Sequence, residues 1–165
     1  METIHHPLDP VWDQRSRVLI LGTMPSPKSR EAGFYYGHPR NRFWSVLAAV
    51  FSEDVPMGTE ARKAFCLRHR IALWDVLASC EIQGASDSSI RQAVANPIDA
   101  LLSQAPIAAV FTTGQKAFKL YQKLCLPMTG KEAISLPSTS PANCAMSLEA
   151  LAERYQIIRG YTETL

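Results

Sequence analysis

The residues with the clearest chemical potential gather in one loop, residues 23–41, and at the start of the helix expected after it. Tyr35 and Tyr36 lie outside any periodic element, so at least one of them is a candidate to stack on a ligand. Phe43 and Trp44 fit better as the inward face of the helix. Rings interleaved with amides and cations suit a flat heteroaromatic base, which is held by stacking and read by hydrogen bonds at its edge. The full set is Phe34, Tyr35, Tyr36, His38, Arg40, Asn41, Phe43 and Trp44.

A second polar loop, residues 138–143, precedes another expected helix. Its serine hydroxyls, amide side chain and backbone N–H groups can approach a phosphate closely, and a helix N-terminus favours an anion. The same composition also fits an ordinary capping turn. We therefore treat this loop as a phosphate-binding candidate that lies beside the first loop.

Charge is concentrated near the first loop. The chain has 165 residues and a formal net charge of +2, which excludes a polycationic tail as its means of binding. Between residues 28 and 42 four cations stand against Glu31, a local excess that would steer a polyanion. A solvated basic loop without a partner is the alternative. The cations are Lys28, Arg30, Arg40 and Arg42.

No pattern typical of covalent or metal chemistry is present. Three lysines, at positions 116, 119 and 123, have the spacing of a solvated helix face, and no serine lies in a GxSxG sequence. The four cysteines lack CxxC spacing, so we expect reduced thiols and no metal or other cofactor. His38 fits a general acid, a ligand for a base or phosphate, or a locally bonded turn residue.

The elements that must position these loops follow an alternating pattern. Buried strands are predicted at residues 17–22, 107–112 and 133–136, each followed by a loop and a helix. This order predicts a three-layer α/β/α sandwich with a central, mostly parallel sheet, in which ligands bind beyond the carboxyl ends of the strands. Helices are expected at 43–51, capped by Asn41, and at 60–69, 115–124 and 147–155.

Three segments have weaker patterns. The prolines of residues 23–41 argue against regular structure early in that loop. Residues 71–77 fit a strand or turn that leads into a polar loop at 79–89. Residues 89–104 fit helical pieces interrupted at Asn96 and Pro97.

Composition predicts one domain over residues 1–165, with its core at about 15–160. Hydrophobic residues make up 47% and charged residues 19%, as in ordinary globular chains. The first ten residues lack the apolar region of a signal peptide, and no apolar run reaches membrane-spanning length. We therefore expect a monomeric cytoplasmic protein without a membrane partner.

Three segments together resemble the signature motifs of the uracil-DNA glycosylase superfamily: residues 21–26 (LGTMPS), 35–44 (YYGHPRNRFW) and 136–143 (LPSTSPAN). The middle segment resembles mismatch-specific uracil and thymine glycosylases. The combination most resembles the DNA-deoxyinosine, or hypoxanthine-DNA, glycosylase branch. The resemblance implies a DNA repair enzyme that flips a deaminated base and hydrolyses its N-glycosidic bond, working at the bacterial nucleoid without strand cleavage.

The resemblance also implies roles for individual residues. Related enzymes have Asp or Asn where this chain has Met24, whose thioether cannot activate water. The resemblance then implies that Asn41 is the main catalytic residue and that His38 assists it. The base would contact Gly22, Thr23, Met24, Pro25, Tyr36 and Ser138, with Tyr36 stacked on it. The expected DNA contacts are Ser26, Lys28, Arg40, Ser140, Asn143 and Ala142, the last at the position of the wedge that fills the vacated stack.

Three readings remain open from sequence. The first is hypoxanthine excision, and the second is a uracil or G:U/G:T mismatch-specific glycosylase. The third is a lesion-binding protein that has lost catalysis, which Met24 favours. A small-molecule nucleotide enzyme is disfavoured because the chain has neither a P-loop nor a GxGxxG sequence.

Overall fold

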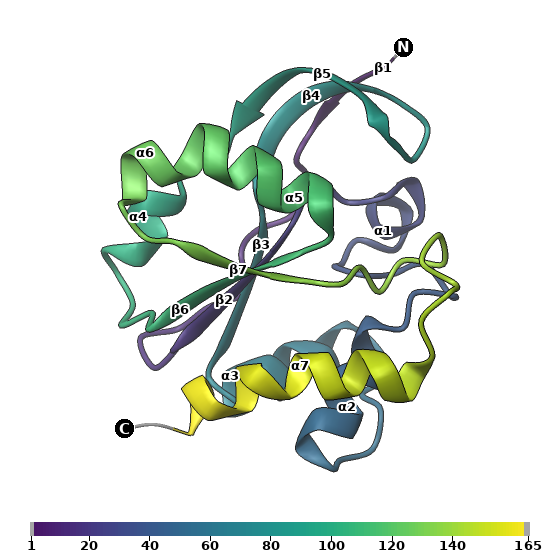
Figure 1. Cartoon of the computed structure of the whole chain (residues 1–165), viewed down its shortest axis with the longest axis vertical. Helices are drawn as coiled ribbons and strands as arrows, with labels where there is room; N and C mark the ends of the chain where they lie inside the picture. The colour runs from purple at the N-terminus through teal and green to yellow at the C-terminus, as the bar shows by residue number, and fades with distance from the viewer. Residues whose placement is uncertain (1, 164–165) are drawn as a thin grey trace.

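A computed structural model describes residues 2–163. Its centre is a four-stranded, wholly parallel sheet in the order β3-β2-β6-β7 (Figure 1). The strands are β2 (Val18–Gly22), β3 (Ile71–Asp75), β6 (Ala109–Thr113) and β7 (Ala133–Leu136). The strands predicted at 17–22, 107–112 and 133–136 are therefore confirmed within one or two residues.

Side chains of the central strand β2 alternate between two hydrophobic cores. Val18 and Ile20 belong to one core, and Leu19 and Leu21 to the other. This alternation is what a strand buried on both faces requires. Helices α2 (Phe43–Phe51), α3 (Thr59–Arg68) and α7 (Leu148–Thr162) cover the first face, and α4 (Ile98–Leu102), α5 (Gln115–Leu120) and α6 (Leu126–Thr129) cover the second (Figure 1). The predicted three-layer α/β/α sandwich is thus confirmed.

The prediction of a polar loop and helical pieces over residues 79–104 is largely wrong. A second, antiparallel sheet in the order β1-β4-β5 occupies most of this stretch. Its strands are β1 (Glu2–His5), β4 (Leu77–Gln83) and β5 (Ser86–Ala95). Strand β5 is mostly exposed and its pairing with β4 is irregular, so its sequence lacks the apolar alternation of a half-buried strand. Only the short helix α4 fits the helical prediction.

The first loop also contains a helix that its prolines had argued against. Helix α1 (Pro27–Ala32) begins with Pro27 in its first turn, where a missing N–H costs no intrahelical hydrogen bond. Ser26 caps it, since Ser26 Oγ accepts from Ser29 N at 3.1 Å. Gly33 ends it in the left-handed region at φ 77°.

Three other helix boundaries differ from expectation. The N-cap of α2 is Arg42, not Asn41, although Asn41 Oδ1 still accepts the Phe43 N–H. The helix expected at 115–124 continues past α5 through a π-helical turn, η1 (Tyr121–Cys125), into α6. Helix α7 extends seven residues beyond the expected end at 155. These shifts leave the polar loops at the carboxyl edge of the sheet, where the sequence had placed them.

Candidate active site

A cavity of about 270 Å³ opens at the carboxyl edge of the parallel sheet. It lies between the loops that follow β2 and β7, the end of β3, and the tip of the β4–β5 hairpin. This is the edge at which ligands bind in open parallel sheets. The structure brings ten of the predicted residues together in its lining: Gly22, Thr23, Met24, Pro25, Ser26, Tyr36, His38, Asn41, Ser138 and Ser140.

Asn41 joins the two loops. Its Oδ1 accepts from Phe43 N at 2.9 Å and from Thr139 Oγ1 at 2.8 Å. The Phe43 N–H can only donate, so the oxygen must face these two partners and Thr139 must donate as well. Both acceptor positions are therefore occupied. The group that Asn41 offers to a ligand is its Nδ2, which is a hydrogen-bond donor.

His38 is fixed in a similar way. Its Nδ1 accepts from Arg40 N at 3.0 Å, so in the neutral ring the proton lies on Nε2. His38 lines the cavity, and its Nε2–H is the ring group left to donate to a ligand. The nearby Gly37 N donates to Ser29 Oγ at 2.9 Å, which attaches this turn to α1.

Tyr36 stacks on Phe43, with ring centroids 3.7 Å apart and an angle of 10° between the planes. Its backbone has φ 52°, a left-handed conformation that is uncommon for a bulky residue and often marks a functional site. Its hydroxyl lies 3.3 Å from Thr113 Oγ1. Because Phe43 covers one face of the ring, a flat ligand can stack only on the other face. Tyr35 is instead a core residue, 2% exposed, whose hydroxyl donates to Asp9 O.

Arg42 holds the second loop in place. Its guanidinium donates from Nη1 to Met146 O and from Nη2 to Asn143 O, at 2.5 and 2.8 Å. Asn143 Nδ2 in turn donates to Ser138 O at 2.8 Å. Arg42 is therefore a structural clamp rather than a free cation, and Asn143 braces the loop from outside the cavity.

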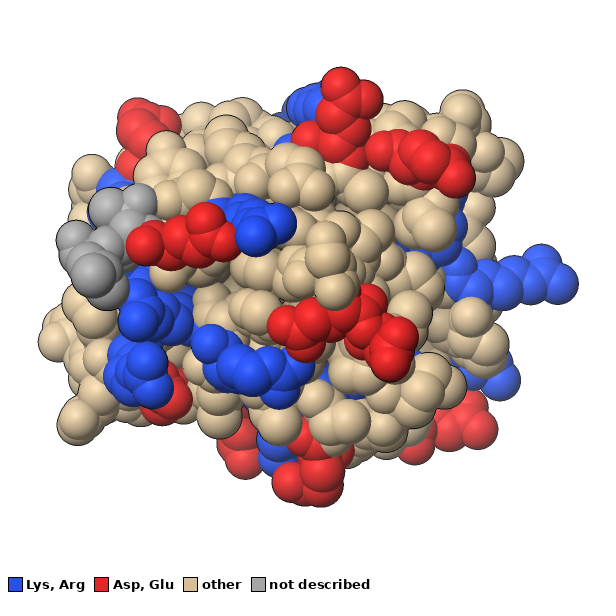
Figure 2. All heavy atoms as spheres, turned by 90° about the horizontal axis from the view of Figure 1, so that it is seen from below, with Lys and Arg blue, Asp and Glu red and all other residues tan. Residues whose placement is uncertain are grey.

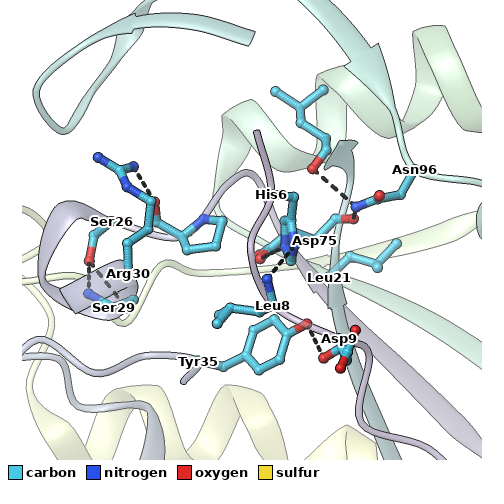
Figure 3. A network of polar contacts seen from close by, with 12 residues as sticks. His6, Leu8, Asp9, Leu21, Ser26, Ser29, Arg30, Tyr35, Asp75 and Asn96 are labelled. Atoms are coloured by element: carbon cyan, nitrogen blue, oxygen red, sulfur yellow. Dashed lines mark hydrogen bonds and ion pairs between the residues drawn. The ribbon is translucent and has the colours of Figure 1, made fainter. Parts of the chain in front are cut away.

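The cavity wall also contains a buried carboxylate, Asp75, whose hydrogen bond to His6 sequence reasoning missed. His6 Nε2 lies 2.7 Å from Asp75 Oδ2, and their side chains are 4% and 6% exposed. Figure 3 shows His6 reaching from the N-terminal segment to Asp75 at the end of β3. A Cβ added at Gly22 would stand 2.6 Å from Asp75 Oδ1, so only glycine leaves room for this carboxylate. The sequence did contain one signal for this site, because Asp75 is an acidic residue at the end of an apolar strand.

Four predicted DNA contacts do not line the cavity: Lys28, Arg40, Ala142 and Asn143. Lys28 is exposed and lies 3.7 Å from Glu31. Arg30, the fourth member of the predicted cation group, donates to Pro25 O and pairs with Glu2. Only Arg40 of this group has a guanidinium without an ion pair or hydrogen bond within residues 2–163. The local charge is thus largely neutralised or committed to structure.

Charge elsewhere is mixed. Figure 2 views the molecule from the side of α2, α3 and α7, and it shows acidic and basic side chains interspersed with broad uncharged areas. No single-sign field covers that face. Within the described residues, no helix has the length and apolar character needed to cross a membrane.

Comparison with known proteins agrees with this geometry. The family model described as the uracil DNA glycosylase superfamily matches residues 10–159. The chain belongs to this superfamily. It is therefore a DNA glycosylase, and its substrate is DNA.

Two curated relatives of this glycosylase are named hypoxanthine DNA glycosylase. The one from Methanosarcina barkeri is 34% identical over 136 residues, covering 81% of this chain and 85% of the relative. The one from Methanosarcina acetivorans is 33% identical over 151 residues, covering 90% and 94%. A solution NMR structure from M. acetivorans, described as a candidate uracil DNA glycosylase, superposes with a TM-score of 0.80 at 31% identity, covering 93% of this chain and 96% of that one.

The glycosylase cavity also contains hairpin residues that the sequence did not single out: Ile82, Gly84, Ala85 and Asp87. Their segment was predicted as a polar loop, and nothing local in the sequence predicts that it folds back over the sheet edge. Met24 lies in the lining as well and is partly buried against the core on the α5 side. The position where the resemblance implied a water-activating acid or amide is thus occupied by an apolar side chain.

Proposed function

We propose that this glycosylase removes hypoxanthine from DNA by hydrolysing the N-glycosidic bond of a flipped deoxyinosine. The names of both curated relatives support this substrate. The observation that carries the chemistry is the bonding of Asn41, whose oxygen is fully used within the protein and whose N–H group remains for the ligand. A donor at this point suits a leaving group that gains negative charge.

Leaving-group stabilisation is the main catalytic effect in this proposal. When the C1′–N9 bond breaks, its electron pair goes to the base and positive charge develops on the sugar. Donors from Asn41 Nδ2 and His38 Nε2 stabilise the charge that spreads over the purine O6 and N7. Water then adds to C1′, and the proton it loses neutralises the departing base. Asn41 thus acts on the base, since its occupied oxygen cannot accept a proton from that water.

Stacking holds the flipped base in position. The free face of Tyr36 covers it, so that Phe43, Tyr36 and the base form a continuous stack. Backbone groups of the loop that begins at Gly22 border the base, and Ser138 and Ser140 lie where they can meet the sugar and phosphates. Lys28, Arg40 and Asn143 contact the flanking DNA, and Ala142 approaches the vacated stack.

We further propose that the enzyme is monofunctional, acting as a cytoplasmic monomer. Lyase chemistry needs an amine nucleophile, and no lysine is among the described residues that line the cavity. Borohydride treatment during turnover should therefore trap no protein–DNA adduct. A trapped adduct would contradict the hydrolytic mechanism.

The substrate is tested with duplexes that contain a single deoxyinosine, deoxyuridine, deoxyxanthosine or mismatched thymidine. Alkali converts each abasic site into a strand break, and single-turnover rates are compared. We expect deoxyinosine to react fastest. Uracil is the second candidate, because the similar NMR structure is described as a candidate uracil enzyme. Binding of these duplexes without release of any base would instead favour the non-catalytic alternative.

A further inference from the structure

Thr139 lies between Ser138 and Ser140, for which the sequence predicted contacts to the base and to DNA, and no role was predicted for it. The residue is buried, with 1% of its surface exposed. Its carbonyl oxygen accepts from Arg42 N at 3.1 Å, and its hydroxyl donates to Asn41 Oδ1 at 2.8 Å. Two hydrogen bonds thus join Thr139 to consecutive residues of the first loop.

The hydroxyl of Thr139 differs in its bonding from those of its neighbours. Serine and threonine in a capping turn bond to the backbone of their own segment. Ser138 Oγ and Ser140 Oγ do this, since they accept from Ser140 N and Ala142 N at 3.1 and 3.2 Å. Thr139 instead bonds across to the other loop. An ordinary turn explains the two serines but does not explain this contact.

The contact fixes the direction of the Asn41 amide. The Phe43 N–H decides that the oxygen faces it, but a single hydrogen bond leaves the amide plane free to turn. The Thr139 hydroxyl reaches the same oxygen from the other loop. Donors to an sp² oxygen prefer positions near the plane of its group, so two donors together define that plane. The two Nδ2–H bonds lie in the same plane, and their direction is therefore fixed as well.

The same contact strengthens the Asn41 donor. Both hydrogen bonds draw electron density toward Oδ1, and linked hydrogen bonds inside a protein polarise one another. The Nδ2 protons then carry more positive charge. A departing base gains negative charge as the glycosidic bond breaks, so a polarised donor stabilises the transition state more than the bound substrate.

We infer that Thr139 is a positioning residue for base excision, whose hydroxyl orients and polarises the Asn41 amide so that Nδ2 donates to the departing base. This inference rests on the proposed function. Burial keeps water from competing for the hydroxyl, and the β-branched side chain restricts its rotation. Because Thr139 acts through Asn41, its loss should slow bond cleavage and leave DNA binding nearly unchanged.

The test measures single-turnover excision from the duplex on which the wild type reacts fastest. Thr139→Val keeps the β-branched shape and removes the hydroxyl. We expect its rate to fall about tenfold, with the Kd for the duplex within about twofold, as for loss of one hydrogen bond that acts in the transition state. Thr139→Ser keeps the donor and should stay within about threefold of the wild-type rate.

Thr112→Val is the matched control. Thr112 is also buried, on β6, but its hydroxyl has no hydrogen-bond partner within residues 2–163. Thr112→Val should therefore keep the wild-type rate. If it slows excision as much as Thr139→Val does, loss of a buried hydroxyl has a general effect, and the inference is overturned.

A double-mutant cycle asks whether the effect passes through Asn41. In an Asn41→Ala background, Thr139→Val should change the rate less than about twofold, because the amide that it positions is gone. An equal fall in both backgrounds would mean that Thr139 acts elsewhere, and it would overturn the inference. Should Asn41→Ala be too slow to measure, Thr139→Ser decides: recovery of the rate supports the inference, and a rate as low as that of Thr139→Val overturns it.

The remaining outcomes separate this inference from the proposed function. If the wild type releases no base from any duplex, the proposed function fails and the inference fails with it. If the wild type is active and Thr139→Val keeps its rate, the inference alone is overturned. Should Thr139→Val fail to fold by thermal melting, Thr139→Ala replaces it with the same expected results. If neither variant folds, the hydroxyl supports the fold rather than the amide, which also overturns the inference.

Discussion

The two sides of the cavity are built differently. Asn41 and Ser138 lie on loops that bind each other through Thr139 and the Arg42 guanidinium. Asp75 lies opposite, at the end of the edge strand β3, which the sheet holds in register with Gly22 on β2. The loop side presents N–H donors, and the strand side presents a carboxylate acceptor. Substitutions on the loop side should therefore change chemistry at little cost to stability, whereas those on the strand side should affect both.

The largest effect should come from Asn41→Asp. The carboxylate keeps an oxygen for the Phe43 N–H and the Thr139 hydroxyl, but it replaces the free donor with an acceptor. We expect the single-turnover rate to fall about a hundredfold or more, as for removal of a transition-state donor, with a melting temperature close to that of wild type. Gln156→Glu, at an exposed amide on α7, is the charge-matched control. If Asn41→Asp keeps the wild-type single-turnover rate, a residue other than Asn41 must stabilise the leaving group.

Gly22→Ala should couple activity to stability. Its Cβ would stand 2.6 Å from Asp75 Oδ1, so the carboxylate or the strand must shift. Overpacking of about 1–3 kcal/mol predicts a melting temperature lower by about 2–10 °C, and activity should fall about tenfold or more. Gly160→Ala is the matched control, because a Cβ there meets no atom within 4 Å. If Gly22→Ala melts at the wild-type temperature, the close approach of Asp75 to Gly22 is contradicted.

Arg42→Lys should affect binding more than chemistry. An ammonium cannot reproduce the two guanidinium bonds to Met146 O and Asn143 O, so the second loop loses part of its support. We expect KM for the substrate duplex to rise about three- to tenfold, while the single-turnover rate at saturating enzyme stays within threefold. An equal fall in both would mean that Arg42 also positions the reacting groups.

Asp87→Asn should have the smallest effect. Asp87 lies on the exposed hairpin tip at the cavity edge, unlike the buried Asp75. Its side chain is exposed, although partial burial at the cavity edge raises the pKa of the carboxyl group. An exposed carboxylate contributes little, so excision rates should change less than threefold at moderate salt. A larger loss would show that the hairpin, too, contacts the substrate closely, and it would weaken the contrast between the two acidic residues.

The same contrast explains what could be predicted from sequence. The loop-side residues Tyr36, His38, Asn41 and Ser138 lie in short, distinctive segments, and the apolar strands before them are easily recognised. Asp75 ends an ordinary apolar strand, and its proximity to Gly22 depends on parallel pairing between strands about fifty residues apart. A local sequence pattern cannot predict which two strands pair.

The β4–β5 hairpin and the N-terminal segment were still harder to predict from the sequence. Strand β5 is exposed and irregular, so neither the alternation nor the apolar content of a strand was present. His6 precedes a proline in a segment that composition suggested was peripheral, and its partner is 69 residues away. The basic cluster shows another limit, because formal charge does not reveal that the Arg42 guanidinium is bound to two carbonyl groups.

The bonds that close the cavity join residues far apart in the chain: 69 positions for His6 and Asp75, 98 for Asn41 and Thr139, and 104 for Arg42 and Met146. Loops of this length close slowly, after local helices have formed. Competence for base excision should thus be acquired at the end of folding and lost early in unfolding, before helical content declines. A partly folded chain would contain helices but no complete cavity. It would therefore not excise bases from DNA.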